Sequence, residues 1–99
     1  MSLYTRLTQP SSNKIPIHGF KEVMHDYYRG NITAQNVIDE FNLDAGETAE
    51  ATAIYQAAVN ATNKLAYFEQ VFGYLAMAEL GLMPSQYNEA NFNAFIAGV

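Results

Sequence analysis

Apolar residues recur at helical spacing in the first third of the chain. Together they form one face of an amphipathic helix that we expect to run from about Pro16 or His18 to Arg29. Gly30 follows at the position where a left-handed residue commonly ends a helix, and the cationic Arg29 suits the last turn. The predicted apolar face consists of Ile17, Phe20, Val23, Met24 and Tyr27.

A second short helix is predicted directly after Asn31-Ile32. Thr33 is a residue type that caps helix N-termini through its side-chain oxygen, so we expect the helix to run from Ala34 to Phe41. Its inner face would present Val37, Ile38 and Phe41. The first forty or so residues therefore predict two short helices in succession.

A longer apolar pattern begins at Asp44 and Glu47, which have the spacing of a capping box. Small or apolar residues then alternate in steps of three and four, as at the a and d positions of a heptad repeat. These positions form a continuous apolar seam whose spacing is never interrupted. The pattern therefore favours one helix of about 35 residues, some 50 Å long, ending at Gly81. The seam consists of Ala51, Ile54, Ala58, Ala61, Leu65, Phe68, Phe72 and Leu75.

An alternative places a turn at Asn60-Ala61-Thr62-Asn63, between two antiparallel helices. The bulky half of the seam, Phe68, Phe72 and Leu75, is predicted to be core. The smaller half is predicted to mediate self-association, because small residues allow helices to approach closely. These predicted interface residues are Ala51, Ile54, Ala58, Ala61 and Leu65.

The two ends of the chain look different from its middle. Residues 1–15 are predicted to be an N-terminal arm that frays or docks on a neighbour, residues 16–83 a helical domain, and residues 84–99 a docking segment. Ser85 is the expected N-cap of a last short helix, which must dock because isolated short helices are marginal in water. The plainer interpretation is that this helix docks on its own chain, and the alternative is that it docks on a neighbouring subunit. The apolar stripe of the helix comprises Phe92, Phe95, Ile96 and Val99, of which the first three are the predicted docking contact.

Composition narrows the choice of function. Only 15% of residues are charged, against about 25% in an ordinary soluble domain, so much of the surface is expected to be covered by other subunits. Five Lys and Arg against ten Asp and Glu give a net charge of -5, which argues against nucleic-acid binding. The chain has no cysteine, which excludes disulfides and thiolate chemistry. No apolar run is long enough to span a bilayer.

Catalytic signatures are missing, so we expect no enzymatic activity and no cofactor. One metal-like arrangement occurs, Glu22-x-x-His25 with Asp26 one residue later. Di-iron sites in helical bundles use this spacing, but they need two such motifs and two further carboxylates. A symmetric dimer would have to supply the second motif, with Glu69 or Glu79 as additional ligands. A surface pair of no special function is the favoured interpretation.

Residues 16–41 also have the length of a helix-turn-helix, with Gln35 and Asn36 as residue types that read adenine. Asp39 and Glu40 would face phosphates on the same helix, so a helical hairpin that packs on the longer helix is the favoured interpretation.

Several phrases, taken in order, resemble a group of small helical proteins that tailed bacteriophages encode, often near virion and tail genes. The resemblance covers about residues 14–83 and leaves both ends outside it. It implies a component of the virion or of its assembly and carries no enzymatic activity or catalytic residue. The phrases are Lys14–Phe20, Tyr28–Thr33, Phe41–Asp44, Thr62–Tyr67 and Ala78–Gly81.

The sequence thus predicts an all-α protein that acts as a non-enzymatic structural or interaction subunit of a bacteriophage particle, in its tail, fibre or connector. We expect it to associate with itself, with other virion proteins, or with both. It would be made in the bacterial cytoplasm and end in the virion. The first alternative is a small acidic cytoplasmic regulator that binds a host protein. The second is a metal-binding helical oligomer that uses Glu22 and His25.

Overall fold

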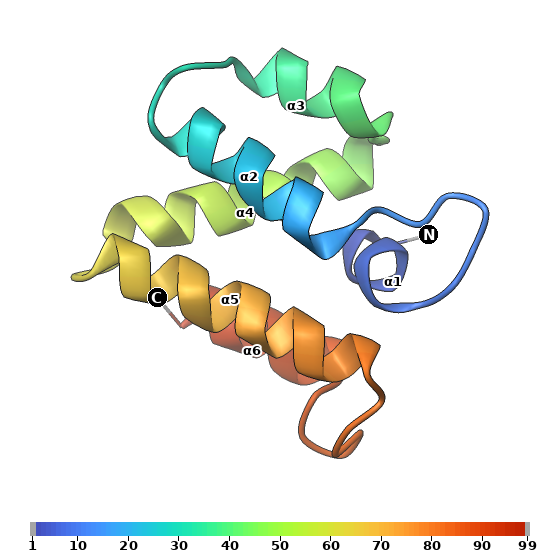
Figure 1. The fold of residues 1–99 in the computed structure, drawn as a ribbon. Coiled ribbons are helices and arrows are strands. Elements are labelled where there is room, and N and C mark those ends of the chain that lie inside the picture. The colour runs from blue at the N-terminus through green and yellow to red at the C-terminus, as the bar shows by residue number, and fades with distance from the viewer. Residues whose placement is uncertain (1, 99) are drawn as a thin grey trace.

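A computed structural model describes residues 2–98 of the chain (Figure 1). Within these residues the chain forms six helices and no strand, which confirms the all-α class. The Cα radius of gyration of 12.6 Å is that of a compact domain of about 100 residues. The helices are α1 (Leu3–Thr8), α2 (Ile17–Tyr28), α3 (Ala34–Phe41), α4 (Ala45–Asn60), α5 (Lys64–Glu79) and α6 (Glu89–Ala97).

The two predicted short helices are present as α2 and α3. The Thr33 side chain accepts a hydrogen bond from Asn36 N, as expected of an N-cap, and Asn42 ends α3 in the left-handed conformation. Gly30 follows α2 with a φ of 79°, a conformation that glycine adopts without steric cost. Local sequence signals are sufficient for most of these boundaries, because the end of α2 and both ends of α3 depend on a glycine, a capping side chain or a left-handed Asn. Pro16 precedes α2 without a side-chain cap.

The long helix predicted over residues 44–80 is wrong, and the alternative of two helices is correct. The chain leaves α4 at Ala61, whose backbone is extended, and Asn63 begins α5 by accepting a hydrogen bond from Ala66 N. The capping box of Asp44 and Glu47 is confirmed at the start of α4. The seam residues on each side of the turn, from Ala51 to Ala58 and from Phe68 to Leu75, face one shared core, whereas Leu65 beside the turn is exposed.

The core lies where α2, α4 and α5 meet α1. Phe68, Phe72 and Leu75 are buried, which confirms their predicted place in the core. The Phe68 ring packs edge-on against Tyr28 of α2 and parallel to Phe72 of its own helix. Such aromatic pairs add to the free energy of burial, so they hold α5 firmly against α2. The largest fully buried side chains are Phe20, Phe68, Leu3, Leu7, Met24, Ile54, Leu75 and Val71.

Residues 1–15 are not an arm. Leu3 and Leu7 are 1% and 0% exposed, and α1 packs against α4 and α5, so this segment completes the core rather than leaving it. Ile15 is also buried, and its N–H donates to Arg6 O at 2.9 Å. The predicted boundary at residue 15 therefore falls inside the packed structure. A helix of six residues is too short for its apolar spacing to stand out in the sequence.

The C-terminal segment docks in its own chain. Asn88, rather than the predicted Ser85, caps α6 by accepting a hydrogen bond from Asn91 N. In Figure 1 the helix lies along α5, and the ring of Phe95 stacks on that of Tyr67 with 5.9 Å between centroids. Phe92 and Ile96 are buried and Phe95 is half-buried. Val99, the last member of the predicted stripe, lies outside the described residues.

Candidate interaction site

The structure buries most of the predicted self-association seam inside the monomer. Ala51, Ile54 and Ala58 are 4%, 1% and 0% exposed and belong to the core. Ala61 is half-buried, whereas the Leu65 side chain is 64% exposed. The prediction is therefore corrected: the chain folds back at residues 61–63, so α2 and α5 cover the stripe that a continuous helix would have offered to a second copy.

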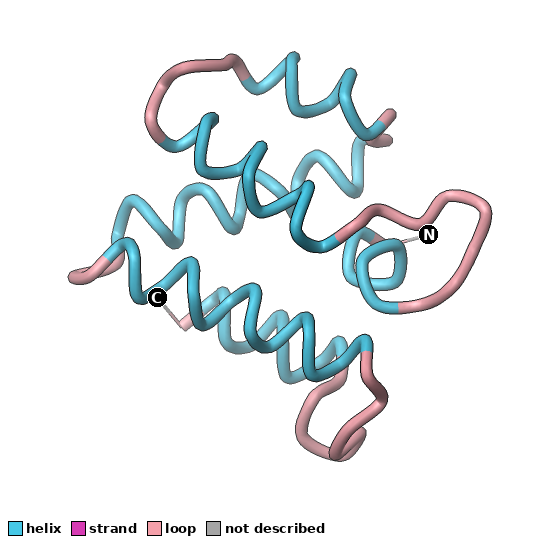
Figure 2. The backbone as a smooth tube through the Cα atoms, viewed as in Figure 1, coloured by secondary structure: helices cyan, strands magenta, loops and turns pink. Residues whose placement is uncertain are grey.

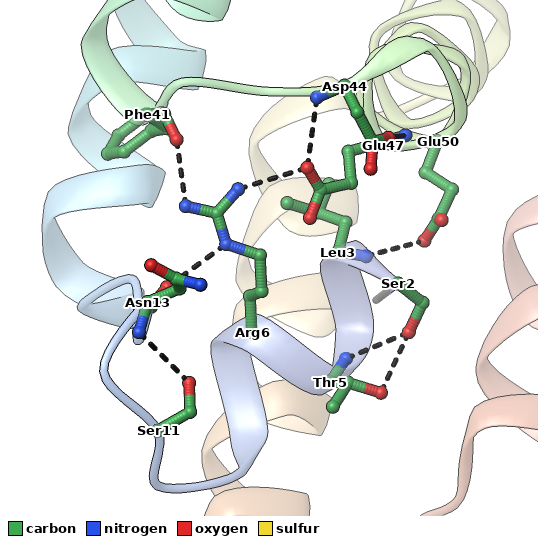
Figure 3. Close-up of polar contacts among 10 residues, drawn as sticks. All are labelled: Ser2, Leu3, Thr5, Arg6, Ser11, Asn13, Phe41, Asp44, Glu47 and Glu50. Atoms are coloured by element: carbon green, nitrogen blue, oxygen red, sulfur yellow. Dashed lines mark hydrogen bonds and ion pairs between the residues drawn. The ribbon is translucent and has the colours of Figure 1, made fainter.

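Arg6 fixes the position of α1, and the sequence offered no signal for it (Figure 3). Its Nε donates to Asn13 O at 3.0 Å and its Nη2 to Phe41 O at 2.8 Å. Its Nη1 donates to the Glu47 carboxylate at 3.0 Å, and both side chains are buried. Glu47 Oε1 also accepts from Asp44 N. One guanidinium thus ties α1 to the following loop, to the end of α3 and to the start of α4.

The position of α1 creates an apolar groove between α1, α4 and α6. The groove has a volume of about 490 Å³, which lies within the range of ordinary binding pockets. Its floor is apolar, and its α4 side carries small and amide side chains. The floor residues are Leu3, Leu7, Ile54, Ala57, Phe92 and Ile96; the rim includes Ala49, Ala53, Gln56, Asn60 and Asn93.

One carboxylate lies in the groove among these apolar groups. Glu50 Oε2 accepts a hydrogen bond from Leu3 N at 3.2 Å. Burial raises the pKa of Glu50 above its usual value; hydrogen bonds from the Leu3 and Tyr4 backbone oppose the shift, and the nearby carboxylates of Glu89 and Glu47 add to it. No Lys or Arg of the described chain lines the groove. The groove therefore carries negative charge without a cation from its own protein.

Large apolar side chains are also exposed at both ends of α5. Val59 and Leu65 flank the turn between α4 and α5, at 42% and 64% exposure. Leu80, Leu82 and Met83 follow α5 with 70%, 46% and 58% exposure. These three begin the connection to α6, which Figure 2 shows as a loop that projects from the helices. Several exposed large apolar side chains at one end of a helix are candidates for contact with another protein.

The arrangement around His25 does not resemble a metal centre. Among residues 2–98 no three His, Cys, Asp or Glu side chains come together as a ligand set. Glu22 pairs with His18 at 3.0 Å, and Glu69 pairs with Lys21 at 2.8 Å. The His25 ring lies against Phe68 with 4.6 Å between centroids, and its Nε2 is buried without a hydrogen-bond partner in the described structure. This ring contributes to packing.

The stability of the protein is expected to fall as the pH is lowered through 6.5, because of His25. Burial, followed by the charges of Arg29 and Lys21, lowers the pKa of His25 below 6.5, although Glu69 and Asp26 oppose the shift. Between the lowered pKa and 6.5 the unfolded chain binds more protons than the folded one, so acid favours unfolding. Urea unfolding at pH 7.5, 6.5 and 5.5 measures this slope.

Two variants assign the slope to its side chain. His25→Gln is expected to unfold with a smaller dependence on pH over this range. His18→Gln, which removes the other, highly exposed histidine and retains His25, is expected to keep the wild-type slope. A wild-type slope in His25→Gln would contradict the assignment.

The polar side chains of α3 favour the interpretation of α2 and α3 as a packing hairpin rather than a DNA-reading helix-turn-helix. Gln35 donates to Asp39 at 2.8 Å, and the Asn36 side chain accepts from Thr33 N at 2.8 Å. The two residues proposed as base readers therefore make hydrogen bonds within α3 and its cap. Asp39 and Glu40 are exposed on the same helix. The hairpin packs on α4 and α5 through α2.

Comparison with known proteins adds no relative. Neither protein-family models, nor curated proteins, nor solved structures yield a match to this chain. None of the helices in the described part of the chain has the length and apolar character needed to cross a membrane.

Proposed function

We propose that the protein is a non-enzymatic interaction subunit, and specifically a structural component of a bacteriophage particle in its tail, fibre or connector. The observation that carries the interaction role is the apolar groove between α1, α4 and α6, with the exposed residues at the two ends of α5 in support. The sequence resemblance to small phage proteins supports the location of the protein in the phage particle.

The geometry favours contacts with other proteins through these surfaces rather than through the seam of α4. The core of the monomer already buries Ala51, Ile54 and Ala58, whereas the side chains of Val59, Leu65 and Leu80 are exposed. Contacts at the two ends of α5 would join different patches of successive copies. Contacts of this kind close into rings or continue as tubes, depending on the rotation between subunits.

The proposal is tested with purified phage particles. Quantitative mass spectrometry is expected to find the chain at a fixed ratio to the major tail protein, retained through gradient purification. In parallel, the wild-type chain and a variant carrying Leu80→Gln and Leu82→Gln are compared in their incorporation. The variant is expected to incorporate less while its helical circular dichroism is unchanged. Absence of the chain from pure particles would refute the particle role.

The acidic groove also favours a second candidate, a small regulator that binds a basic host protein. Glu50 lines the groove, Glu89 lies near enough to act on its pKa, and the whole chain carries -5. A regulator would remain in the infected cell and be missing from purified particles, so the same measurement separates the two functions.

A further inference from the structure

The groove of α1, α4 and α6 has one wall that is unusually open to close approach. Ala49, Ala53 and Ala57 recur every fourth residue of α4 and therefore form a row along one side of the helix, about 12 Å long. Ala49 and Ala53 are exposed. Because alanine projects so little, another helix can approach this row to an axis separation of about 8 Å.

The opposite side of α4 is already buried. Ala51, Ile54 and Ala58 pack in the core, so α4 presents apolar or small residues on two sides. On the second side Ala49 and Ala53 are exposed, whereas Ala57 at the end of the row is 4% exposed. The described chain therefore leaves uncovered the first two alanines of the row and the groove beside them.

The charges of the groove indicate what kind of side chain it accepts. Glu50 lies in the groove, and burial raises its pKa; hydrogen bonds from the Leu3 and Tyr4 backbone oppose this rise, and the charges of Glu89 and Glu47 add to it. The described chain provides no cation on the lining. A lysine or arginine from a partner would relieve the repulsion among these carboxylates and replace part of the solvation that Glu50 has lost.

We propose that the groove binds an amphipathic helix of a partner protein, whose apolar side chains fill the groove and whose lysine or arginine pairs with Glu50. The inference deepens the proposed function, on which it rests, by specifying the chemistry of the partner. Apolar side chains at i, i+3, i+4 and i+7 would lie along the groove, as in other helix-in-groove complexes. The amides of Gln56, Asn60 and Asn93 at the rim would bond the polar edge of the bound helix.

The test uses the intact chain and four labelled peptides of about 14 residues, roughly four helical turns. Each peptide has leucines at helical spacing, and a single lysine stands at a different turn in each. Matched peptides carry glutamine in place of lysine. Fluorescence anisotropy measures the dissociation constants. At least one lysine peptide is expected to bind, and about three- to tenfold more tightly than its glutamine counterpart.

Three protein variants locate the binding. Ala53→Gln lengthens an exposed side chain of the groove wall and is expected to weaken binding at least tenfold. Thr52→Gln is the matched control, because Thr52 is exposed on the adjacent position of α4 and does not line the groove. It is expected to bind like the wild type. Glu50→Gln is expected to remove the preference for lysine over glutamine while the glutamine peptide binds as before.

Three results would overturn the proposal. The first is that none of the four lysine peptides binds. The second is binding that Ala53→Gln leaves unchanged while circular dichroism shows that this variant is folded. The third is saturable binding of dodecyltrimethylammonium below its micellar concentration without peptide binding, which would identify a site for a small apolar cation. Particle incorporation is measured separately, so failure of the peptides and failure of the particle role are distinguishable.

Discussion

Replacing Arg6 by methionine is expected to lower the free energy of unfolding by about 3–5 kcal/mol. The substitution leaves the Glu47 carboxylate buried without its cation and removes the donors to Asn13 O and Phe41 O. Because α1 is held by these contacts, the loss is expected to loosen α1 before the rest of the core. Urea denaturation followed by circular dichroism measures the free energy, and Arg29→Met is the matched control.

A control variant and a double variant test whether the loss of stability in Arg6→Met comes from the buried ion pair. Arg29 has a side chain that is 60% exposed, so Arg29→Met is expected to change stability by less than about 0.5 kcal/mol. Combining Arg6→Met with Glu47→Met removes the unpaired carboxylate, so the double variant is expected to lose less than the sum of the two single losses. Equal stability of Arg6→Met and wild type would contradict the proposed role of the ion pair.

Replacing Phe68 by alanine is also expected to cost about 3–5 kcal/mol, because the side chain is 1% exposed and its removal leaves a cavity between α2 and α5. His25, Tyr28 and Phe72 all place their rings against it. A loss of this size is expected to lower the midpoint of thermal unfolding by roughly 15 °C or more.

Leu65→Ala is the control for Phe68→Ala, on the same helix and three residues earlier. Its side chain is 64% exposed, so the substitution is expected to change stability by less than about 0.5 kcal/mol. A continuous helix would instead have placed both residues on one buried seam. Similar losses for the two variants would therefore contradict the fold described.

Several parts of the fold follow from short stretches of sequence. Thr33 begins α3, Asp44 and Glu47 begin α4, and Gly30 follows α2, because each uses a side chain or a backbone conformation within four residues. The buried aromatic residues of α5 follow from their spacing. These features depend on local chemistry, which a sequence displays directly.

The position of the turn between α4 and α5 shows where periodicity fails. The heptad phase runs through residues 61–63 without a slip, and a single helix is its simplest explanation. In the structure Asn63 caps α5, and the two helices bury the stripe in one core except at the turn, where Leu65 is exposed. A periodic pattern records which side of a helix is buried, and it does not record whether the cover comes from the same chain or from another.

The candidate site depends even more on tertiary structure. Leu3 and Leu7, Ala53 and Ala57, and Phe92 and Ile96 come from three helices far apart in the sequence, and only their packing encloses a groove. Glu50 becomes distinctive because burial and Glu89 act on it. The sequence by itself determined the helical class, the bounds of α2 and α3, the start of α4 and the aromatic core of α5. The reversal at Asn63, the docking of α1 by Arg6 and the groove were decided by tertiary structure, because their energies come from contacts between residues distant along the chain.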